Sequence, residues 1–237
     1  MRFFHFRLMG SLLFSMGTLA APGYVMVPQI REISLPVEHI YILSGFDSND
    51  APELFVSGWY ANPCQEWGRA IIYLDRDSQK IDINLKALSR DSSDAVCINM
   101  AVPYLESIKL GSLSSGTWAL AIGDRIENLP IIEAESSSID EHLYGQVRHV
   151  TSSDDELTLH IELPSSCIEL DRIEAIYNGK NACAILPIMK KVKEHCPRDP
   201  RMKEYSYTIP EAYLTAEKVL FHVRSLEGKS VNHLYSR

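Results

Sequence analysis

Glu38-His39-Ile40-Tyr41 opens a stretch that ends at Cys64, and Glu141-His142-Leu143-Tyr144 opens a second stretch that ends at Cys167. A Glu-Leu pair lies inside each copy, at Glu53-Leu54 and at Glu156-Leu157. One offset of 103 positions aligns all three landmarks. Because chance rarely places a tetrapeptide, a dipeptide and a cysteine in the same register, the sequence predicts a duplicated unit.

The repeat divides the chain into two domains. A length of 237 residues gives room for two units of about 100 residues each. We expect a first domain at 21–135, which includes an extended N-terminal lead-in, and a second domain at 136–237. The polar segment 135–138, Glu-Ser-Ser-Ser, marks the junction.

Residues 1–20 have the features of a secretory signal peptide. Arg2 and Arg7 give a basic start, residues 8–19 form an uncharged and mostly apolar core, and Ala20 and Ala21 offer small residues at a cleavage point. The apolar core is too short for a membrane anchor, and no later stretch has the length and apolarity of a transmembrane segment. We therefore expect a mature protein that is periplasmic or secreted and has no transmembrane segment.

The charge of the protein argues against one class of partner. The formal net charge is −8, and it becomes −10 when the two arginines of the leader are removed. An acidic surface repels phosphate backbones. Nucleic acid is therefore not expected as the principal partner.

Five cysteines in an exported chain are expected to form disulfides. Cys64 and Cys97 lie 33 positions apart in the first copy, and Cys167 and Cys196 lie 29 positions apart at matching places in the second. The sequence predicts one bridge per domain, Cys64–Cys97 and Cys167–Cys196. Cys183 then remains as a buried free thiol in an apolar stretch, while a Cys183–Cys196 bridge stays open as the competing pairing.

The pattern of apolar and turn-forming residues predicts an all-β fold. Strands are expected at 37–43 and 53–60, separated by a solvated polar turn at 45–52. A hairpin follows, in which residues 81–85 alternate strictly between apolar and polar. No long pattern with a period of 3.6 residues occurs, so helix should be scarce.

The second copy repeats the hairpin. Ile176-Tyr177 corresponds to Ile72-Tyr73, and the connection carries Asn178-Gly179. This dipeptide is a strong signal for a two-residue turn in which both central residues have positive φ.

A short motif in the first domain points to a fold family. Leu110-Gly111 is followed by a loop and then by Gly116-Thr117-Trp118-Ala119-Leu120-Ala121-Ile122. This resembles the E–F corner of immunoglobulin-like and fibronectin-type-III-like β-sandwiches, in which an aromatic residue starts the penultimate strand. The resemblance implies two tandem immunoglobulin-like β-sandwich domains. The predicted disulfides do not match the inter-sheet bridge of antibody domains, so the resemblance is to the class.

No cofactor or metal ion is expected. Asp47, Asn49 and Asp50 carry oxygen donors suited to calcium, and their loop resembles the acidic linker of cadherin repeats, but the order and spacing differ from that family. We interpret the loop as a solvated turn. The histidines at 142, 149 and 160 lack the spacing of a recognised zinc site.

A basic run in the second domain is the candidate binding site. Its members are Lys190, Lys191, Lys193, Arg198, Arg201 and Lys203. In an otherwise acidic protein this run would attract an anionic partner, such as a carboxylate-bearing glycan, an anionic lipid head group or an acidic protein face. Aromatic residues are secondary candidates for contact anchors, at positions 59, 60, 67, 205, 207 and 213.

Catalytic signatures are missing from the sequence. The serines at 112–115 do not form a Gly-x-Ser-x-Gly elbow, and neither a phosphate-binding glycine loop nor a His-Glu-x-x-His motif occurs. We therefore expect a non-catalytic protein that binds a protein or an envelope surface component. Two alternatives remain open: a periplasmic pilus-type chaperone, a family that resembles this chain in size and in having two such domains, and an envelope hydrolase with an unrecognised site.

Overall fold

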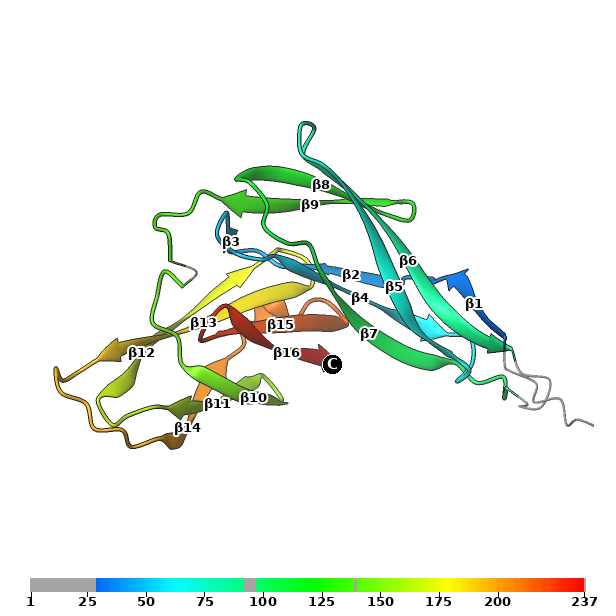
Figure 1. Ribbon diagram of the computed structural model, residues 1–237. Helices are drawn as coiled ribbons and strands as arrows, with labels where there is room; N and C mark the ends of the chain where they lie inside the picture. The colour runs from blue at the N-terminus through cyan, green and yellow to red at the C-terminus, as the bar shows by residue number, and fades with distance from the viewer. Residues whose placement is uncertain (1–28, 92–96, 139, 237) are drawn as a thin grey trace, which may run out of the picture.

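The computed structural model describes residues 29–91, 97–138 and 140–236, and within them the chain is almost entirely β-strand (Figure 1). The one helical segment in this part of the chain is a short 3₁₀ turn, η1 (Glu211–Tyr213). No helix among the described residues is long and apolar enough to cross a bilayer. The expected signal peptide lies outside the described residues.

The first half of the chain forms two facing sheets. One sheet has the order β2-β4-β7. In the other, β1 and β8 pair with different parts of one edge of β6, β5 pairs with the opposite edge, and the sheet continues from β8 through β9 to β3. The strands are β1 (Gln29–Ser34), β2 (His39–Ile42), β3 (Phe46–Asp47), β4 (Glu53–Tyr60), β5 (Gln65–Asp75), β6 (Lys80–Asp91), β7 (Val102–Lys109), β8 (Gly116–Ile122) and β9 (Arg125–Ile132).

The alternation predicted for residues 81–85 is confirmed, and it builds the first core. Ile81, Ile83 and Leu85 are buried, whereas the residues between them are exposed. They pack in one cluster with Leu54 of β4 and with Trp118 of β8, which is fully buried. The two sheets therefore enclose a common apolar layer, as a β-sandwich does.

The second half forms another pair of facing sheets, with the orders β10-β11-β14 and β12-β13-β15-β16. Its strands are β10 (Gln146–Ser153), β11 (Glu156–Leu163), β12 (Ile168–Tyr177), β13 (Ala182–Lys191), β14 (Arg201–Thr208), β15 (Lys218–Ser225) and β16 (Lys229–Ser236). The core between these sheets contains Leu159 and Ile161 of β11, Ile185 of β13 and Phe221 of β15.

The two pairs of sheets share strand order and parallel pairing. The path β5-β6-β8-β9 corresponds to β12-β13-β15-β16, and each contains one parallel pair, β6 with β8 and β13 with β15. Strands β4 and β5 begin 103 positions before β11 and β12. The parallel pairs depart from the antiparallel sheets that the immunoglobulin resemblance implies. The predicted β-sandwich class is confirmed, but the pairing of the strands differs from that of immunoglobulin domains.

The two segments that align in the sequence, 38–41 and 141–144, differ in structure. His39 begins β2, whereas its repeat partner His142 lies outside any named strand, and Tyr144 forms only an isolated bridge to Ile188. The two-residue turn predicted at Asn178-Gly179 is wrong. β12 and β13 are joined by four residues, 178–181, because the Asn178 side-chain oxygen accepts the backbone N–H groups of Lys180, Asn181 and Ala182.

The two sandwiches are joined by buried polar contacts. In the segment predicted as a solvated turn, Asp47 and Asp50 are buried, so that prediction is wrong. Asp50 Oδ1 accepts a hydrogen bond from Arg224 Nη2 of β15 at 2.5 Å, and both side chains are less than a tenth exposed. The Arg224 guanidinium also lies 5.5 Å from the centre of the Phe46 ring. Asp50 is therefore buried against the second sandwich, whereas Ala51 of the same turn is exposed.

His222 is a second buried polar group at this junction. Its Nδ1 lies 2.7 Å from Asn232 Oδ1 and 3.6 Å from Glu53 Oε1, and it neighbours Arg224 along β15. Its Nε2 has no hydrogen-bond partner among the described residues. Burial lowers the pKa of His222 from its usual 6.5 to about 4, because the charged imidazolium is poorly solvated there.

We expect His222 to destabilise the protein in mild acid. The unfolded chain binds a proton at His222 below about pH 6.5, whereas the folded protein resists it until about pH 4. Stability contributed by the neutral ring is therefore lost as pH falls through this window, by about 2 kcal/mol between pH 7.5 and pH 5. Urea unfolding at the two pH values measures this loss. In the His222→Gln variant, the fall in unfolding free energy between the two pH values should be smaller by about 2 kcal/mol. A variant with the pH dependence of the wild type would show that His222 is not the cause.

Candidate functional site

The candidate site is the basic tip, which we define as Lys190, Lys191, Lys193, Arg198, Arg201 and Lys203. It spans the end of β13, the connection 192–200 and the start of β14. In Figure 1 this connection runs at the far end of the second sandwich from β1 and the first sandwich. Every residue of 191–200 is exposed. The tip is therefore open to a large partner.

Lys190 belongs to an ion-pair network on the outer face of β12 and β13. Its Nζ lies 3.0 Å from Asp171 Oδ1. Asp171 also pairs with Arg172, which in turn pairs with Glu174. The charge of Lys190 is thus largely neutralised within the protein, and Lys190 is the weakest of the six candidates for an anionic partner.

The other five cations of the basic tip are unpaired. Within the described part of the chain, none of them takes part in an ion pair; they are Lys191, Lys193, Arg198, Arg201 and Lys203. Elsewhere in the second sandwich, Arg148, Lys180 and Lys229 each pair with a carboxylate. The tip is consequently a place where positive charge is left available to solvent.

Arg201 and Lys203 occupy a different position from the lysines of the connection. Residues of β14 alternate between half-buried and exposed, and Arg201 and Lys203 share the half-buried face with Tyr205 and Tyr207. Arg201 Nη2 donates to the Ser166 carbonyl at 3.4 Å. The guanidinium of Arg201 therefore holds β14 against the loop before β12, and the exposed charge of the tip is carried mainly by residues 191–198.

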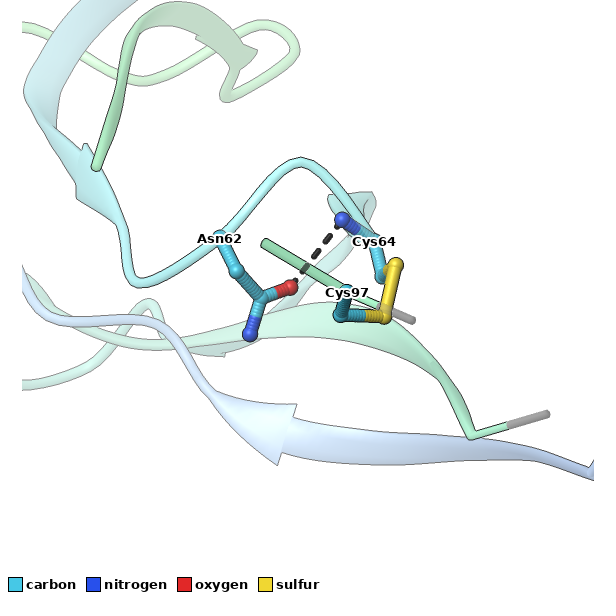
Figure 2. Close-up of a disulfide and its surroundings, with 3 residues drawn as sticks. All are labelled: Asn62, Cys64 and Cys97. Atoms are coloured by element: carbon cyan, nitrogen blue, oxygen red, sulfur yellow. Dashed lines mark hydrogen bonds between the residues drawn. A yellow bond between two sulfur atoms is a disulfide. The ribbon is translucent and has the colours of Figure 1, made fainter. Parts of the chain in front are cut away.

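The predicted Cys64–Cys97 bridge of the first sandwich is present (Figure 2). Cys64 follows the loop after β4, where its backbone N–H donates to Asn62 Oδ1 at 3.0 Å. Figure 2 shows the Asn62 side chain turned toward this amide beside the bridge. The bond fixes the start of β5 to the segment that follows β6.

The predicted Cys167–Cys196 bridge is not formed in the structure, where both residues carry free thiols. Cys167 is buried just before β12, where its thiol donates to the His195 carbonyl, and Cys196 is exposed in the connection, where its thiol donates to the Lys193 carbonyl. The bridge stays a prediction. Cys183 is free and fully buried at the opposite end of β13, and burial raises its pKa to about 12. The competing Cys183–Cys196 pairing does not fit this placement.

The alternative sites from the sequence do not assemble into metal centres. In the loop considered for calcium, Asp50 is bound by Arg224, and Asp47 Oδ1 accepts the amides of Asn49 and Asp50. His149 and His160 do stack across β10 and β11 with ring centres 3.7 Å apart. Among the described residues, however, no group of three or more candidate ligands is placed to hold a metal ion.

Most of the aromatic candidates belong to the cores. Tyr60 is buried beside Tyr104, and Trp67 packs on the first core. Tyr205, Tyr207 and Tyr213 pack on the second core. Trp59 is the exception, because it is 43% exposed and its indole N–H donates to Glu38 Oε2 at 3.0 Å. The aromatics therefore do not form a contact surface that rivals the basic tip.

Comparison with known proteins gives one finding about the fold. The family model of the ORF11 β-sandwich domain matches residues 54–130, which run from β4 into β9 of the first sandwich. The match supports the β-sandwich class and covers about a third of the chain. No curated protein and no solved structure matches the chain significantly.

Proposed function

We propose that this protein is a non-catalytic binding protein of the periplasm or the extracellular space, and that it holds an anionic group of a surface partner at the basic tip. The observation that carries the proposal is the group of five cations on and beside one exposed connection that form no ion pair with any residue the structure describes. Unpaired positive charge on an acidic protein attracts anions locally while the rest of the surface repels them. The Cys64–Cys97 bridge is consistent with an oxidising compartment.

The organisation of the chain supports placing the binding site in the second domain. We infer that domains 21–135 and 136–237 arose by internal duplication, since they share sheet order and the offset of their strands. Duplicated sandwiches need the same core but not the same loops. The basic connection 192–200 belongs to the second copy alone, and it is where a binding role specific to that copy is expected.

A charge-reversal variant tests the proposal. Lys191→Glu, Lys193→Glu and Arg198→Glu together should weaken retention on an anionic polysaccharide resin or on vesicles of anionic phospholipid by at least about tenfold, or roughly 1.4 kcal/mol. The loss should be largest at low ionic strength, where charges are least screened. Because all three residues are exposed, the free energy of unfolding should change by less than about 1 kcal/mol.

The matched control reverses three exposed cations of the first sandwich, Arg76, Lys80 and Lys109. It makes the same change in net charge far from the basic tip. If the control lost as much binding as the tip variant, the net charge of the protein would account for the binding, and the position of the cations would not matter. Normal binding by the tip variant at low salt would reject the proposed site.

A further inference from the structure

Two free cysteines lie at the base of the basic tip. Cys167 is 1% exposed, and its thiol donates to the His195 carbonyl at 3.3 Å. That contact brings the next residue, Cys196, alongside Cys167, and the Cys196 thiol donates to the Lys193 carbonyl at 3.4 Å. The Val192 amide also donates to the Cys167 carbonyl at 2.8 Å. Cys196 lies in the exposed connection outside any strand, so a bond to Cys167 requires no rearrangement of the paired strands.

The surroundings distinguish the two sulfurs. The neighbouring Cys196 side chain lowers the pKa of the Cys167 thiol, and Ser165 and the ammonium groups of Lys193 and Lys191 lower it further. The same contact raises the pKa of Cys196, so the pair holds one proton tightly and releases the other readily. Cys167 is thus the buried sulfur that carries negative charge most easily, and Cys196 is the sulfur that solvent can reach.

We propose that Cys167 and Cys196 form a thiol–disulfide exchange site, with low-molecular-weight thiols and disulfides as its reaction partners, and that closing their bond fixes the basic tip in its binding arrangement. The second part rests on the proposed anion-binding function. The first part stands on the placement of the two sulfurs alone.

The exchange runs through the accessible sulfur in both directions. In oxidation, the Cys196 thiolate attacks an external disulfide RSSR and releases RS⁻, and the Cys167 thiolate then attacks the Cys196 sulfur of the mixed disulfide and releases a second RS⁻. The two thiol protons go to the two released thiolates, so RSSR is reduced to two RSH as the protein bond forms. In reduction, an external thiolate attacks the Cys196 sulfur and Cys167 leaves as a thiolate, a departure favoured by a low pKa. A second external thiolate then attacks the external sulfur of the mixed disulfide, so that RSSR leaves and Cys196 is released as a thiolate. The protons of the two RSH go to the two protein thiolates.

The bond would act on the basic tip because Cys196 lies between Lys193 and Arg198. In the reduced form hydrogen bonds hold the connection to the loop before β12, such as the one from the Asp199 amide to the Pro164 carbonyl at 3.3 Å. A covalent bond to Cys167 removes much of the remaining freedom of the connection. Ordering the unpaired cations in advance strengthens binding, since less entropy is lost when the partner arrives.

A redox titration tests the exchange site, and Cys64–Cys97 serves as the internal control. The full mature chain is equilibrated in glutathione buffers of graded ratio, quenched, alkylated and mapped by mass spectrometry. We expect Cys167–Cys196 to pass from closed to open at glutathione ratios that leave Cys64–Cys97 closed. A pair that never closes, or that opens only together with Cys64–Cys97, would overturn the proposal.

Two variants separate the roles of the residues. Cys167→Ser removes the resolving thiol, so Cys196 should accumulate as a mixed disulfide with glutathione, whereas it should not accumulate in the wild type. Lys191→Gln with Lys193→Gln should slow reductive opening by about threefold to tenfold, because the leaving thiolate loses its stabilising charges. Unchanged opening rates in this variant, or equal glutathione capture by the wild type, would count against the mechanism.

Binding of the closed and open forms separates the two proposals. The closed form should be retained at least about threefold more strongly than the open form on the anionic polysaccharide resin. Equal retention of the two forms would overturn the regulatory part of this inference while the binding function survives. If neither form were retained but exchange proceeded, the binding function would be rejected and the exchange site would stand.

Discussion

The variant Asp50→Ala is expected to lose about 3–5 kcal/mol of its free energy of unfolding, the usual cost of breaking a buried ion pair by removing one partner. Asp50 is 2% exposed, and its carboxylate binds the Arg224 guanidinium through one oxygen and the Asp47 amide through the other. Without that carboxylate, Arg224 remains a buried cation against the Phe46 ring. Urea unfolding measures the loss.

A matched surface pair provides the control for this prediction. Glu227 and Lys229 are joined at 2.8 Å, but both are about two thirds exposed. Glu227→Ala should therefore cost less than about 1 kcal/mol. The double variant Asp50→Leu with Arg224→Met should recover much of the loss, because no unpaired charge stays buried. An Asp50→Ala variant as stable as Glu227→Ala would show that the buried pair contributes nothing to the junction.

The sequence predicted the elements whose signals are local. The limits of β4 agree with the expected strand 53–60, and the alternation in β6 placed Ile81 and Ile83 in the core. The Cys64–Cys97 bridge followed from matching positions in the two copies, and it is present. These features depend on side-chain periodicity and short loops, which a chain displays along its own length.

The contacts between the sandwiches could not be predicted in this way. Asp47 and Asp50 have the composition of a solvated turn, and Arg224, the cation that pairs with the buried Asp50, lies 174 positions later. Asn178 was interpreted as part of a tight hairpin, but its side chain donates to the Ile42 carbonyl of the first sandwich at 2.8 Å. Polar residues that complete an interface look like ordinary loop residues until their partner is known.

The candidate site was predicted as a set of residues but not as an arrangement. All six cations lie at one end of the second sandwich, yet Lys190 is neutralised by Asp171 and Arg201 braces β14 on the Ser166 carbonyl. A run of charge in the sequence does not show which members meet a carboxylate across a strand pair. Lys190 lies opposite Glu169 but pairs with Asp171, at the irregularity between residues 170 and 172, whereas Lys191 lies opposite the apolar Ile168.

Replacing both members of the first bridge, Cys64→Ser with Cys97→Ser, is expected to cost about 4 kcal/mol of stability in the loop-entropy account. The bridge closes a separation of 33 positions, and cutting it frees the unfolded chain more than the folded one. The folded protein keeps its β5–β6 ladder, which holds Gln65 opposite Ser89 whether or not the sulfurs are bonded.

Denaturant unfolding without reductant measures this cost, and the wild type with strong reductant is the matched control. In strong reductant the two should unfold at the same denaturant concentration, because neither then keeps a disulfide. Without reductant the variant should unfold below the oxidised wild type by the cost of the Cys64–Cys97 bond alone. Cys183→Ala measures the separate cost of losing a buried sulfur. Reductant should lower the stability of this variant by the same amount as it lowers that of the wild type. A double-serine variant as stable as the oxidised wild type would mean that the unfolded chain already keeps residues 64 and 97 together, since only then would the bond remove no conformational freedom.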